Sequence, residues 1–368
     1  MTYHNGQRIL ILGAARQGLA LARFLCQQGA RVTLNDNRSA ETLQPALQTL
    51  QGLPVNLVLG GHPLELLDET DLLCLSGGIP LNLPIVQAAI ARGIPLSNDS
   101  QIFLENAPCP VVGITGSAGK TTTTTLVGRM AQAAVEPQRR AWIGGNIGRP
   151  LIDFANAMQP DDIAIMELSS FQLEQMTLSP QVSAVLNITP NHLDRHGTME
   201  QYAAAKARIL AFQDEHGVAV LGRENQGAWN LRPMLRGTLV SFGFQPLNEG
   251  GTGTFLADDT LCLQTGEMIT ELMPREMVEL RGAHNLLNTL AACAIGHAAG
   301  FPVDAMQAAV NGFHGVPHRL EFVRRWNGAA WYNDSIATAP ERTIAAIRSF
   351  SEPLVLLLGE RKKNLPWE

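Results

Sequence analysis

Short apolar runs alternate with longer helical patterns over the first hundred residues. Two apolar runs, at residues 8–13 and 31–36, flank a helical pattern at residues 19–28, and another apolar run follows at residues 71–78. This alternation is typical of a parallel sheet with crossover helices. The proline-rich segment APCP then predicts the end of a first, Rossmann-like domain that covers residues 1–107.

A second α/β domain is predicted to begin at PVVGITG, where a strand leads through a glycine-rich loop into a helix. Three more apolar runs, DIAIMELSS, VSAVLNIT and VAVLG, extend its sheet, and residues 201–212 form a helical pattern. Residues 243–271, rich in Gly, Thr and Asp with short alternating runs, predict an antiparallel hairpin. A long helix ending at Gly300 completes a central, P-loop ATPase-like domain over residues 108–315.

The remaining residues, 316–368, are predicted to form a strand, a helix and a strand in WYNDSIAT, PERTIAAIRSF and PLVLLLGE. One such unit is smaller than a free-standing domain of about 100 residues. We therefore expect the chain to be cut inside a third, partial Rossmann-like domain. The predicted fold class is α/β with three domains.

Composition and charge narrow the choice of partners. With 45% apolar and 16% charged residues the chain is of an ordinary globular type, and a net charge of -6 argues against nucleic acid. The five cysteines show no metal-ligand spacing and are expected to be reduced core residues. Neither a signal sequence nor a run of 18 apolar residues is present, so we expect a cytoplasmic protein without a membrane partner.

The stretch GITGSAGKTT, residues 113–122, predicts a phosphate-binding loop and the use of ATP. Its glycines allow a tight turn, while Lys120 and the start of a helix provide positive potential for phosphates. Thr121 is placed to put a hydroxyl on Mg²⁺. Ile114 stands where the generic motif has glycine, and a plain Gly/Thr-rich turn is the alternative; the flanking strand and helix favour the phosphate loop.

The turn GAARQG, residues 13–18, with Asp36 about twenty residues later, superficially suggests a dinucleotide site. Ala15 replaces the middle glycine that lets the backbone approach a pyrophosphate, which argues against NAD. A nucleotide with a single base stays compatible with the turn.

Further candidate residues follow the ends of strands in the central domain, where ligands bind in open α/β sheets. Glu167 ends one strand, and His192, Asp194 and His196 follow another. A carboxylate there can hold a metal ion, whereas for His196 we favour a structural role. Lys206 lies in the helical stretch YAAAKARIL, where a lysine is most often solvated.

Taken in order, TGSAGKTT, ELSSFQLE, NHLDRHG, AAKARIL, GAHNLLN and PHRLE resemble the Mur ligases, ATP-dependent amide-forming enzymes of peptidoglycan precursor synthesis. The resemblance covers essentially the whole chain and implies the three-domain Mur ligase architecture in a monomer. It also implies ATP, two Mg²⁺ ions and a carbamylated Lys206 as cofactors. The chemistry is reasonable because CO₂ converts a neutral amine into a carboxylate-like group that offers oxygen ligands.

The resemblance implies a role for each of several groups of residues. The ATP site would comprise Gly116, Ser117, Ala118, Gly119, Lys120, Thr121, Thr122, His284, Asn285, Asn288, Arg319 and Asp334. The catalytic residues would be Lys120, Glu167, His192 and Lys206, and the metal ligands Thr121, Glu167, His192 and Lys206. The UDP-muramoyl substrate would contact Ala15, Arg16, Gln17, Asp36, Asn37, Arg38, Ser76, Gly77, Gly78 and Asn146, and glutamate would contact Thr338 and Lys363.

Within the family, the N-terminal turn and NDSIAT are most similar to the ligases that add glutamate to UDP-N-acetylmuramoyl-L-alanine. D-Glutamate is the expected amino acid. Ile336, however, stands where these ligases commonly carry lysine, and a related subfamily that resembles this variant is thought to add L-glutamate. The sequence is also compatible with an amide ligase of the folylpolyglutamate synthase type and with a non-catalytic UDP-muramoyl binding protein.

Overall fold

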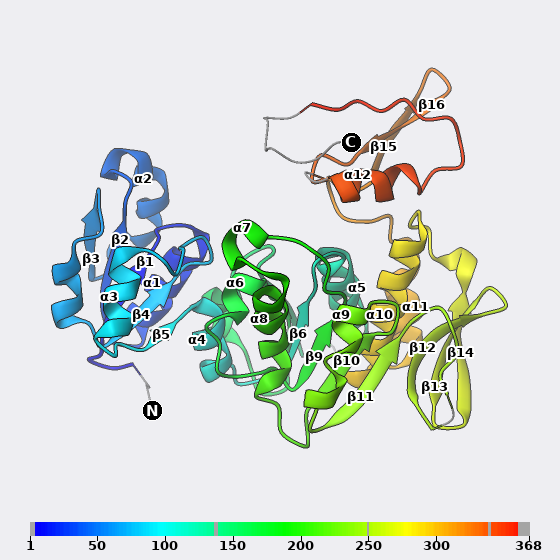
Figure 1. Cartoon of the computed structure of the whole chain (residues 1–368), viewed down its shortest axis with the longest axis horizontal. Coiled ribbons are helices and arrows are strands. Elements are labelled where there is room, and N and C mark those ends of the chain that lie inside the picture. The colour runs from blue at the N-terminus through cyan, green and yellow to red at the C-terminus, as the bar shows by residue number, and fades with distance from the viewer. Residues whose placement is uncertain (1–3, 136–138, 249, 338–339, 360–368) are drawn as a thin grey trace.

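The computed structural model describes residues 4–135, 139–248, 250–337 and 340–359. Its first domain is a five-stranded parallel sheet of strand order β3-β2-β1-β4-β5, on the left in Figure 1. β1 is buried along almost its whole length, which explains its unbroken apolar sequence. The strands and helices are β1 (Arg8–Leu12), α1 (Arg16–Gln27), β2 (Arg31–Asp36), α2 (Ala40–Leu47), β3 (Val55–Leu59), β4 (Leu72–Leu75), α3 (Pro84–Ala91) and β5 (Leu96–Ser97).

The central domain has a nine-stranded sheet of order β14-β13-β12-β11-β10-β9-β6-β8-β7. Its strands are parallel from β7 to β12, and the predicted hairpin is confirmed as β12 and β13, joined by the antiparallel strand β14. The strands are β6 (Val111–Thr115), β7 (Ala141–Gly145), β8 (Ile163–Glu167), β9 (Val182–Val185), β10 (Val218–Gly222), β11 (Thr238–Phe242), β12 (Thr252–Ala257), β13 (Thr260–Thr265) and β14 (Met268–Pro274).

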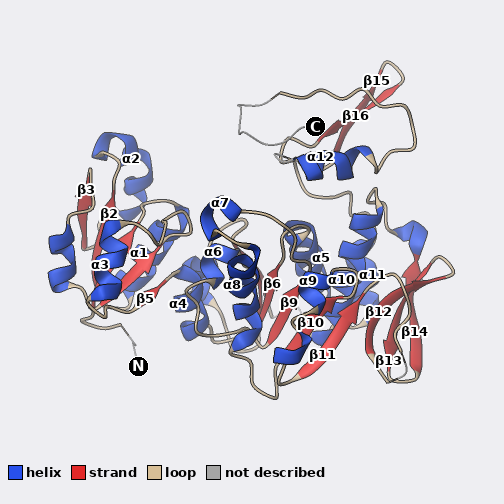
Figure 2. Ribbon diagram, in the orientation of Figure 1, coloured by secondary structure: helices blue, strands red, loops and turns tan. Residues whose placement is uncertain are grey.

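Helices cover the central sheet, as Figure 2 shows. Helix α5 packs against α10 and α11 in one apolar core, whereas the core that contains α8 continues through α4 into the N-terminal domain. The helices are α4 (Asp99–Asn106), α5 (Lys120–Ala134), α6 (Ser170–Leu173), α7 (Leu193–His196), α8 (Met199–Ala211), α9 (Gln226–Trp229), α10 (Ala283–Ala298) and α11 (Val303–Val310). None of the helices in the described ranges has the length and apolar character needed to cross a membrane.

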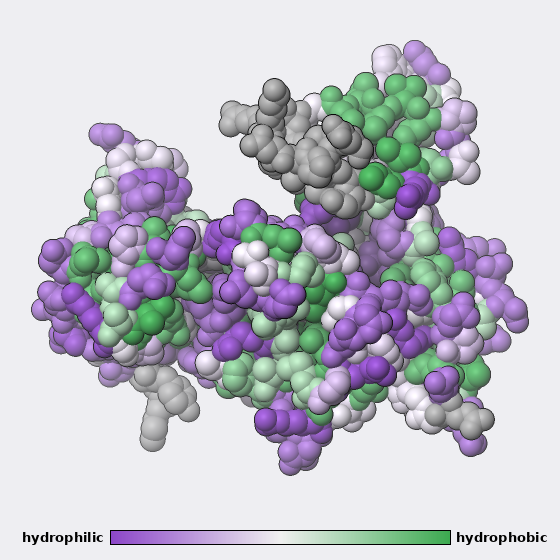
Figure 3. Space-filling model, viewed as in Figure 1, coloured by the Kyte–Doolittle hydropathy of each residue, from purple (hydrophilic) through white to green (hydrophobic). Residues whose placement is uncertain are grey.

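The C-terminal segment differs from the sequence-based prediction. Its strands β15 (Glu321–Trp326) and β16 (Ala329–Asn333) pair antiparallel and precede α12 (Pro340–Ile347). The strand predicted in PLVLLLGE is absent from residues 353–359, which pair with no strand of the described residues, and Val355 is 88% exposed. Apolar side chains therefore gather on the surface of this segment, at the upper right in Figure 3.

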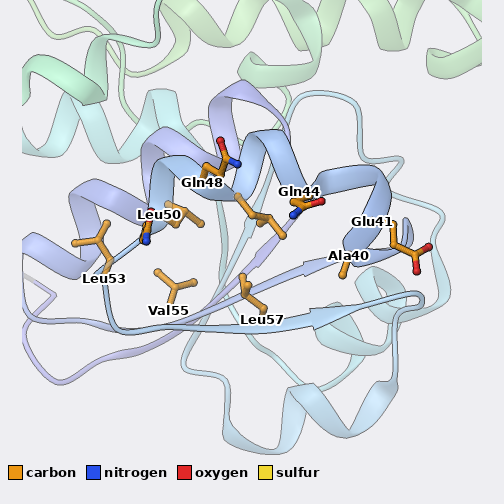
Figure 4. A pocket seen from close by; sticks show the side chains of 10 residues that line it. Ala40, Glu41, Gln44, Gln48, Leu50, Leu53, Val55 and Leu57 are labelled. Atoms are coloured by element: carbon orange, nitrogen blue, oxygen red, sulfur yellow. The ribbon is translucent and has the colours of Figure 1, made fainter.

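A hollow of about 700 Å³ lies between α2 and β3 in the N-terminal domain (Figure 4). Its lining is mostly apolar, with Leu47, Leu50 and Val55 among its side chains, and contains no lysine, arginine or histidine. Since phosphate ligands need basic groups or free backbone N–H groups, this hollow does not fit the predicted nucleotide ligands.

Candidate functional site

The phosphate loop connects β6 to α5 through a turn that only glycine fits well. Gly119 has φ +82°, and a Cβ on it would lie 2.2 Å from Oδ1 of Asn288. The N–H groups of Ser117 and Ala118 donate to the carbonyl and side-chain oxygens of Asn187, respectively. Phosphate binding therefore falls mainly to the first turn of α5, whose N-terminus has no side-chain cap.

Lys120 begins α5 and turns back toward the loop. Its Nζ donates to the carbonyl oxygen of Gly116 at 2.7 Å. Burial lowers the pKa of Lys120 to about 8, an effect that the charge of Glu167 opposes. Phosphate oxygens near this amine would stabilise its charged form, as expected of a phosphate-binding lysine.

Lys206 is buried, contrary to the usual behaviour of a lysine in an alanine-rich helix. It is 1% exposed because α8 packs against β6 and β9, and its Nζ donates to the oxygens of Gly116 at 3.0 Å and Thr115 at 3.3 Å. Burial, with a smaller contribution from the charge of Lys120, lowers the pKa of Lys206 well below its usual value. The lowered pKa favours the neutral, nucleophilic form of this amine.

Glu167 and His192 provide groups that suit a bound cation. Glu167 is 1% exposed; its Oε1 accepts a hydrogen bond from Asn146 at 2.9 Å, whereas its Oε2 has no partner among the described residues. Burial lowers the pKa of His192, and the charge of Lys120 lowers it further, which favours the neutral imidazole. A buried carboxylate oxygen without a donor is costly unless a cation compensates it.

Three of the four predicted catalytic residues line one cavity, and the fourth, Glu167, is hydrogen-bonded to Asn146 in its lining. Its volume is about 230 Å³, and its lining includes Lys120, Asn146, His192 and Lys206. Sequence analysis did not single out four other lining residues: Ser169, Ser170, Phe171 and Tyr202. No three His, Cys, Asp or Glu side chains in the described ranges cluster as metal ligands.

His196 has the structural role that we favoured. Its Nε2 lies 2.9 Å from Oγ of Ser170, and its ring stacks on Phe171 with 5.1 Å between centroids. The side chain is 5% exposed, so its hydrogen bond and its packing leave it little access to a ligand. Asp194 lies two residues away and is exposed.

The residues predicted to surround the nucleoside of ATP come from α10 and from the C-terminal segment. Asn288 packs against Gly119, which ties α10 to the phosphate loop, and within α10 it donates to Oδ1 of Asn285 at 3.2 Å. Burial lowers the pKa of His284, two positions after the positive-φ Gly282. On the other side, Asp334 accepts a hydrogen bond from the N–H of Leu320 at 3.0 Å.

The predicted UDP site is built around the carboxylate of Asp36, which is 4% exposed. Its Oδ2 accepts from the N–H of Ala14 at 2.8 Å, and the guanidinium of Arg38 binds both carboxylate oxygens. The hydrogen bond with Arg38 is the largest cause that lowers the pKa of Asp36 to about 2. Because the fold already engages this carboxylate, Asp36 shapes the turn and orients Arg38, whose own side chain is 46% exposed.

The loop at residues 76–78 lies against the same turn. Ser76 donates to the carbonyl oxygen of Gly13 at 2.8 Å, and Oε1 of Gln17 accepts from the N–H of Gly77 at 3.1 Å. Arg16, beside the exposed Ala15, donates to the carbonyl oxygen of Asn146 at 3.0 Å. Arg16 therefore links the turn to Asn146, which lines the central cavity. Asn37 is exposed beside the turn, and Gly78 has open space around it.

Two family models and many relatives match this chain. The family model described as the Mur ligase middle domain matches residues 114–296, and that of the Mur ligase MurD-like N-terminal domain matches residues 7–98. A protein of Koribacter versatilis named UDP-N-acetylmuramoylalanine--D-glutamate ligase is 38% identical over 99% of this chain and 79% of its own length. The equally named protein of Symbiobacterium thermophilum is also 38% identical, over 98% of this chain and 79% of its own length.

The chain belongs to the Mur ligase family. Solved structures of Mur ligases share its fold. A UDP-N-acetylmuramate:L-alanyl-gamma-D-glutamyl-meso-diaminopimelate ligase from Neisseria meningitides is similar over 84% of this chain and 99% of its own, with a TM-score of 0.57 and 19% identity. For the UDP-N-acetylmuramate-alanine ligase of Thermotoga maritima the TM-score is 0.55 at 18% identity, over 93% of this chain and 77% of that one.

Two residues with roles implied by the Mur ligase resemblance, Thr338 and Lys363, lie outside the described residues. The domain bounds and the individual residue roles stay predictions. In the described part of the chain, α4 joins the N-terminal and central domains: Asn98, its N-cap, donates to the carbonyl oxygen of Gln172 at 2.7 Å.

Proposed function

We propose that this Mur ligase joins glutamate to UDP-N-acetylmuramoyl-L-alanine and converts ATP to ADP and phosphate. The observation that carries the proposal is one cavity lined by Lys120 of the phosphate loop, the buried Lys206 and Asn146, which donates to Glu167. The relatives named UDP-N-acetylmuramoylalanine--D-glutamate ligase support the choice of acceptor and amino acid.

In the proposed reaction, a carboxylate oxygen of the alanine residue attacks the γ-phosphorus of ATP, and the bond from that phosphorus to the bridging oxygen of ADP breaks. The glutamate amine then attacks the acyl carbon of the resulting acyl phosphate. Phosphate leaves, the amine loses a proton and an amide bond has formed. Lys120 and the first turn of α5 bind and orient the phosphates, so catalysis is mainly by positioning and charge neutralisation.

Two Mg²⁺ ions with Thr121, Glu167, His192 and carbamylated Lys206 as ligands complete the proposed site. The unpartnered Oε2 of Glu167 and the lowered pKa of Lys206 support this assignment. When bound, Mg²⁺ neutralises charge on the phosphates. Asn146 orients Glu167 through its hydrogen bond and lies where the muramoyl substrate would enter.

The other predicted residues would bind the UDP group, the nucleoside of ATP and the glutamate. UDP would lie against the turn at residues 13–18 and the loop at residues 76–78, where two hydrogen bonds to Asp36 orient the guanidinium of Arg38. Adenine, ribose and phosphates would lie near Asn285, Asn288, Arg319 and Asp334. Glutamate would be held partly by Thr338 and Lys363. We propose D-glutamate as the amino acid and a cytoplasmic monomer as the active form; L-glutamate is the alternative because of Ile336.

Phosphate release tests the proposal directly. The purified full chain is incubated with ATP, Mg²⁺ and UDP-N-acetylmuramoyl-L-alanine, with D-glutamate or L-glutamate added in separate reactions. We expect release to depend on one glutamate enantiomer and to be lost in Lys120→Ala. An absence of glutamate-dependent release with both enantiomers, from folded protein that still binds ATP, would contradict the proposed reaction.

A further inference from the structure

Arg195 of α7 connects the central domain to residues 76–79 of the N-terminal domain, which we call the substrate loop. Its Nη1 donates to the carbonyl oxygen of Gly78 and its Nη2 to that of Ile79, each at 3.4 Å. In Figure 1, α7 lies on the side of the central domain that faces the N-terminal domain. One guanidinium therefore contacts two consecutive carbonyl groups across the domain boundary.

The guanidinium of Arg195 also rests on the ring of Phe171. Its Cζ lies 4.6 Å from the ring centroid, a distance typical of a cation–π contact. Phe171 lines the central cavity, and its ring lies 5.1 Å from that of His192, centroid to centroid. The side chain of Arg195 therefore contacts a wall of the cavity as well as the substrate loop.

The backbone of α7 holds Arg195 in place. The next residue, His196, is buried, lies 2.9 Å from Oγ of Ser170 and stacks on Phe171. The N–H groups of Arg195 and His196 both donate to the carbonyl oxygen of His192. Because tertiary packing fixes this short helix, Arg195 projects from a rigid support.

The substrate loop is otherwise hydrogen-bonded within its own domain. Ser76 donates to the carbonyl oxygen of Gly13 at 2.8 Å, and the N–H of Gly77 donates to Gln17 at 3.1 Å. For the residues that the structure describes, the hydrogen bonds from the central domain to this loop come from Arg195. Loss of this side chain would leave the loop attached to its own domain but not to the cavity wall.

A second arginine crosses the domain boundary in the opposite direction. Arg16, from the turn at residues 13–18, donates to the carbonyl oxygen of Asn146 at 3.0 Å, and Asn146 lines the same cavity. Both segments predicted to bind the UDP-muramoyl substrate are thus linked to the cavity through an arginine. A ligand that extends from the N-terminal domain into the cavity binds better when these segments are already held at the right separation, because less conformational freedom is lost on binding.

We propose that Arg195 is a positioning residue, which holds the substrate loop at the separation from the cavity that the UDP-muramoyl substrate requires. This inference rests on the proposed function, because it takes that substrate as the ligand of both domains. Arg195 acts through the loop and takes no part in proton transfer.

Two ligands of different length test the inference on the purified full chain. UDP would occupy the N-terminal domain alone, whereas UDP-N-acetylmuramoyl-L-alanine would reach the cavity as well. For Arg195→Ala we expect the Kd of the longer ligand to rise about 3- to 30-fold, as for the loss of one or two hydrogen bonds, while the Kd of UDP changes less than about twofold. Isothermal titration calorimetry measures both constants without turnover.

Two further variants control for charge and for nonspecific effects. Arg195→Lys keeps a cation beside Phe171 but offers one amine to two carbonyl groups, so its Kd for the longer ligand should lie between those of the wild type and Arg195→Ala. Arg236→Ala removes an exposed arginine elsewhere on the central domain and should behave as the wild type. In steady-state kinetics, Arg195→Ala should raise the KM for the muramoyl substrate and leave the KM for ATP unchanged.

The comparison of the two ligands can also overturn the inference. Equal weakening of UDP and of the longer ligand would place the guanidinium on the diphosphate itself. An unchanged Kd for the longer ligand would show that the separation of loop and cavity does not depend on Arg195.

Hydrogen exchange of the ligand-free chain separates this inference from the proposed function. The N–H of Ile79 donates to the carbonyl oxygen of Ser76 at 2.9 Å, and this amide should exchange faster in Arg195→Ala than in the wild type or Arg236→Ala. Unchanged exchange would show that Arg195 does not hold the loop, and would contradict the inference whatever reaction the chain catalyses. A wild type that binds neither ligand would contradict the proposed function and, with it, the positioning of this substrate.

Discussion

Replacement of Gly119 by alanine is expected to damage both the stability of the central domain and its affinity for ATP. The new Cβ would lie 2.2 Å from Oδ1 and 3.1 Å from Cγ of Asn288, so the amide would have to retreat by about 1 Å to reach ordinary contact. The residue would also keep φ at +82°, in the left-handed region that costs a residue with a Cβ about 1–2 kcal/mol.

The two effects add to a measurable loss of stability. Movement of Asn288 breaks its 3.2 Å hydrogen bond to Asn285, worth about 1 kcal/mol. Together with the backbone strain this gives about 2–3 kcal/mol, which lowers the melting temperature of a domain of this size by about 4–12 °C. Because the same turn begins α5, the phosphate-binding N–H groups move too, and the Kd for ATP should rise.

Differential scanning calorimetry and ATP titration of Gly119→Ala measure both quantities. Gly61→Ala is the matched control, since that glycine has open space around it and no positive φ. A Gly119→Ala protein with the melting temperature and the Kd for ATP of the wild type would refute the reasoning, because it would show that Asn288 does not restrict the turn.

Three further substitutions test other parts of the structure. Lys206→Met removes a buried amine whose lowered pKa lowers the stability of the folded protein at pH 7. Calorimetry should therefore show an unchanged or higher melting temperature, and a lower one would contradict this. Turnover and the ¹³C-carbamate NMR signal should be lost. Asp36→Asn should lower the free energy of unfolding in urea by a constant amount from pH 7 to about 4. That difference should shrink as the pH falls from 3.8 toward about 2, because Asp36 becomes protonated in this range. A difference that does not depend on pH would show that the charge of Asp36 is not its cause. Arg23→Ala breaks the 2.6 Å ion pair with Asp153 between the N-terminal and central domains. Urea unfolding should show a loss of about 1 kcal/mol in the free energy of unfolding. Arg31→Ala, which removes an exposed arginine, is the control and should have no effect.

The interior strands could be predicted from sequence because both faces of each are buried. β1 after its first residue, Arg8, and β6 consist of apolar or small residues, and both were expected where they lie. The edge strands β3 and β7 were not expected. Residues 55–59 are only partly buried and residues 141–145 end in two glycines, so neither has the apolar run of an interior strand.

The segment PLVLLLGE shows the opposite error. Its apolar run is what a buried parallel strand requires, yet a strand also needs a neighbour with which to pair. Residues 353–359 have none among the described residues, and Leu357 is 78% exposed. An apolar run therefore predicts a tendency to be buried in a sheet, and the sheet itself must come from other parts of the chain.

Some features of the site depend on residues that are contiguous in sequence, and others depend on tertiary packing. The phosphate loop could be predicted because its glycines, Lys120 and helix start are contiguous in sequence. The burial of Lys206 could not, because it depends on the packing of α8 on the central sheet and not on the residues around it. Its lowered pKa follows from that packing. The shift arises because the fold excludes water from the amine, and that exclusion is a property of the tertiary structure.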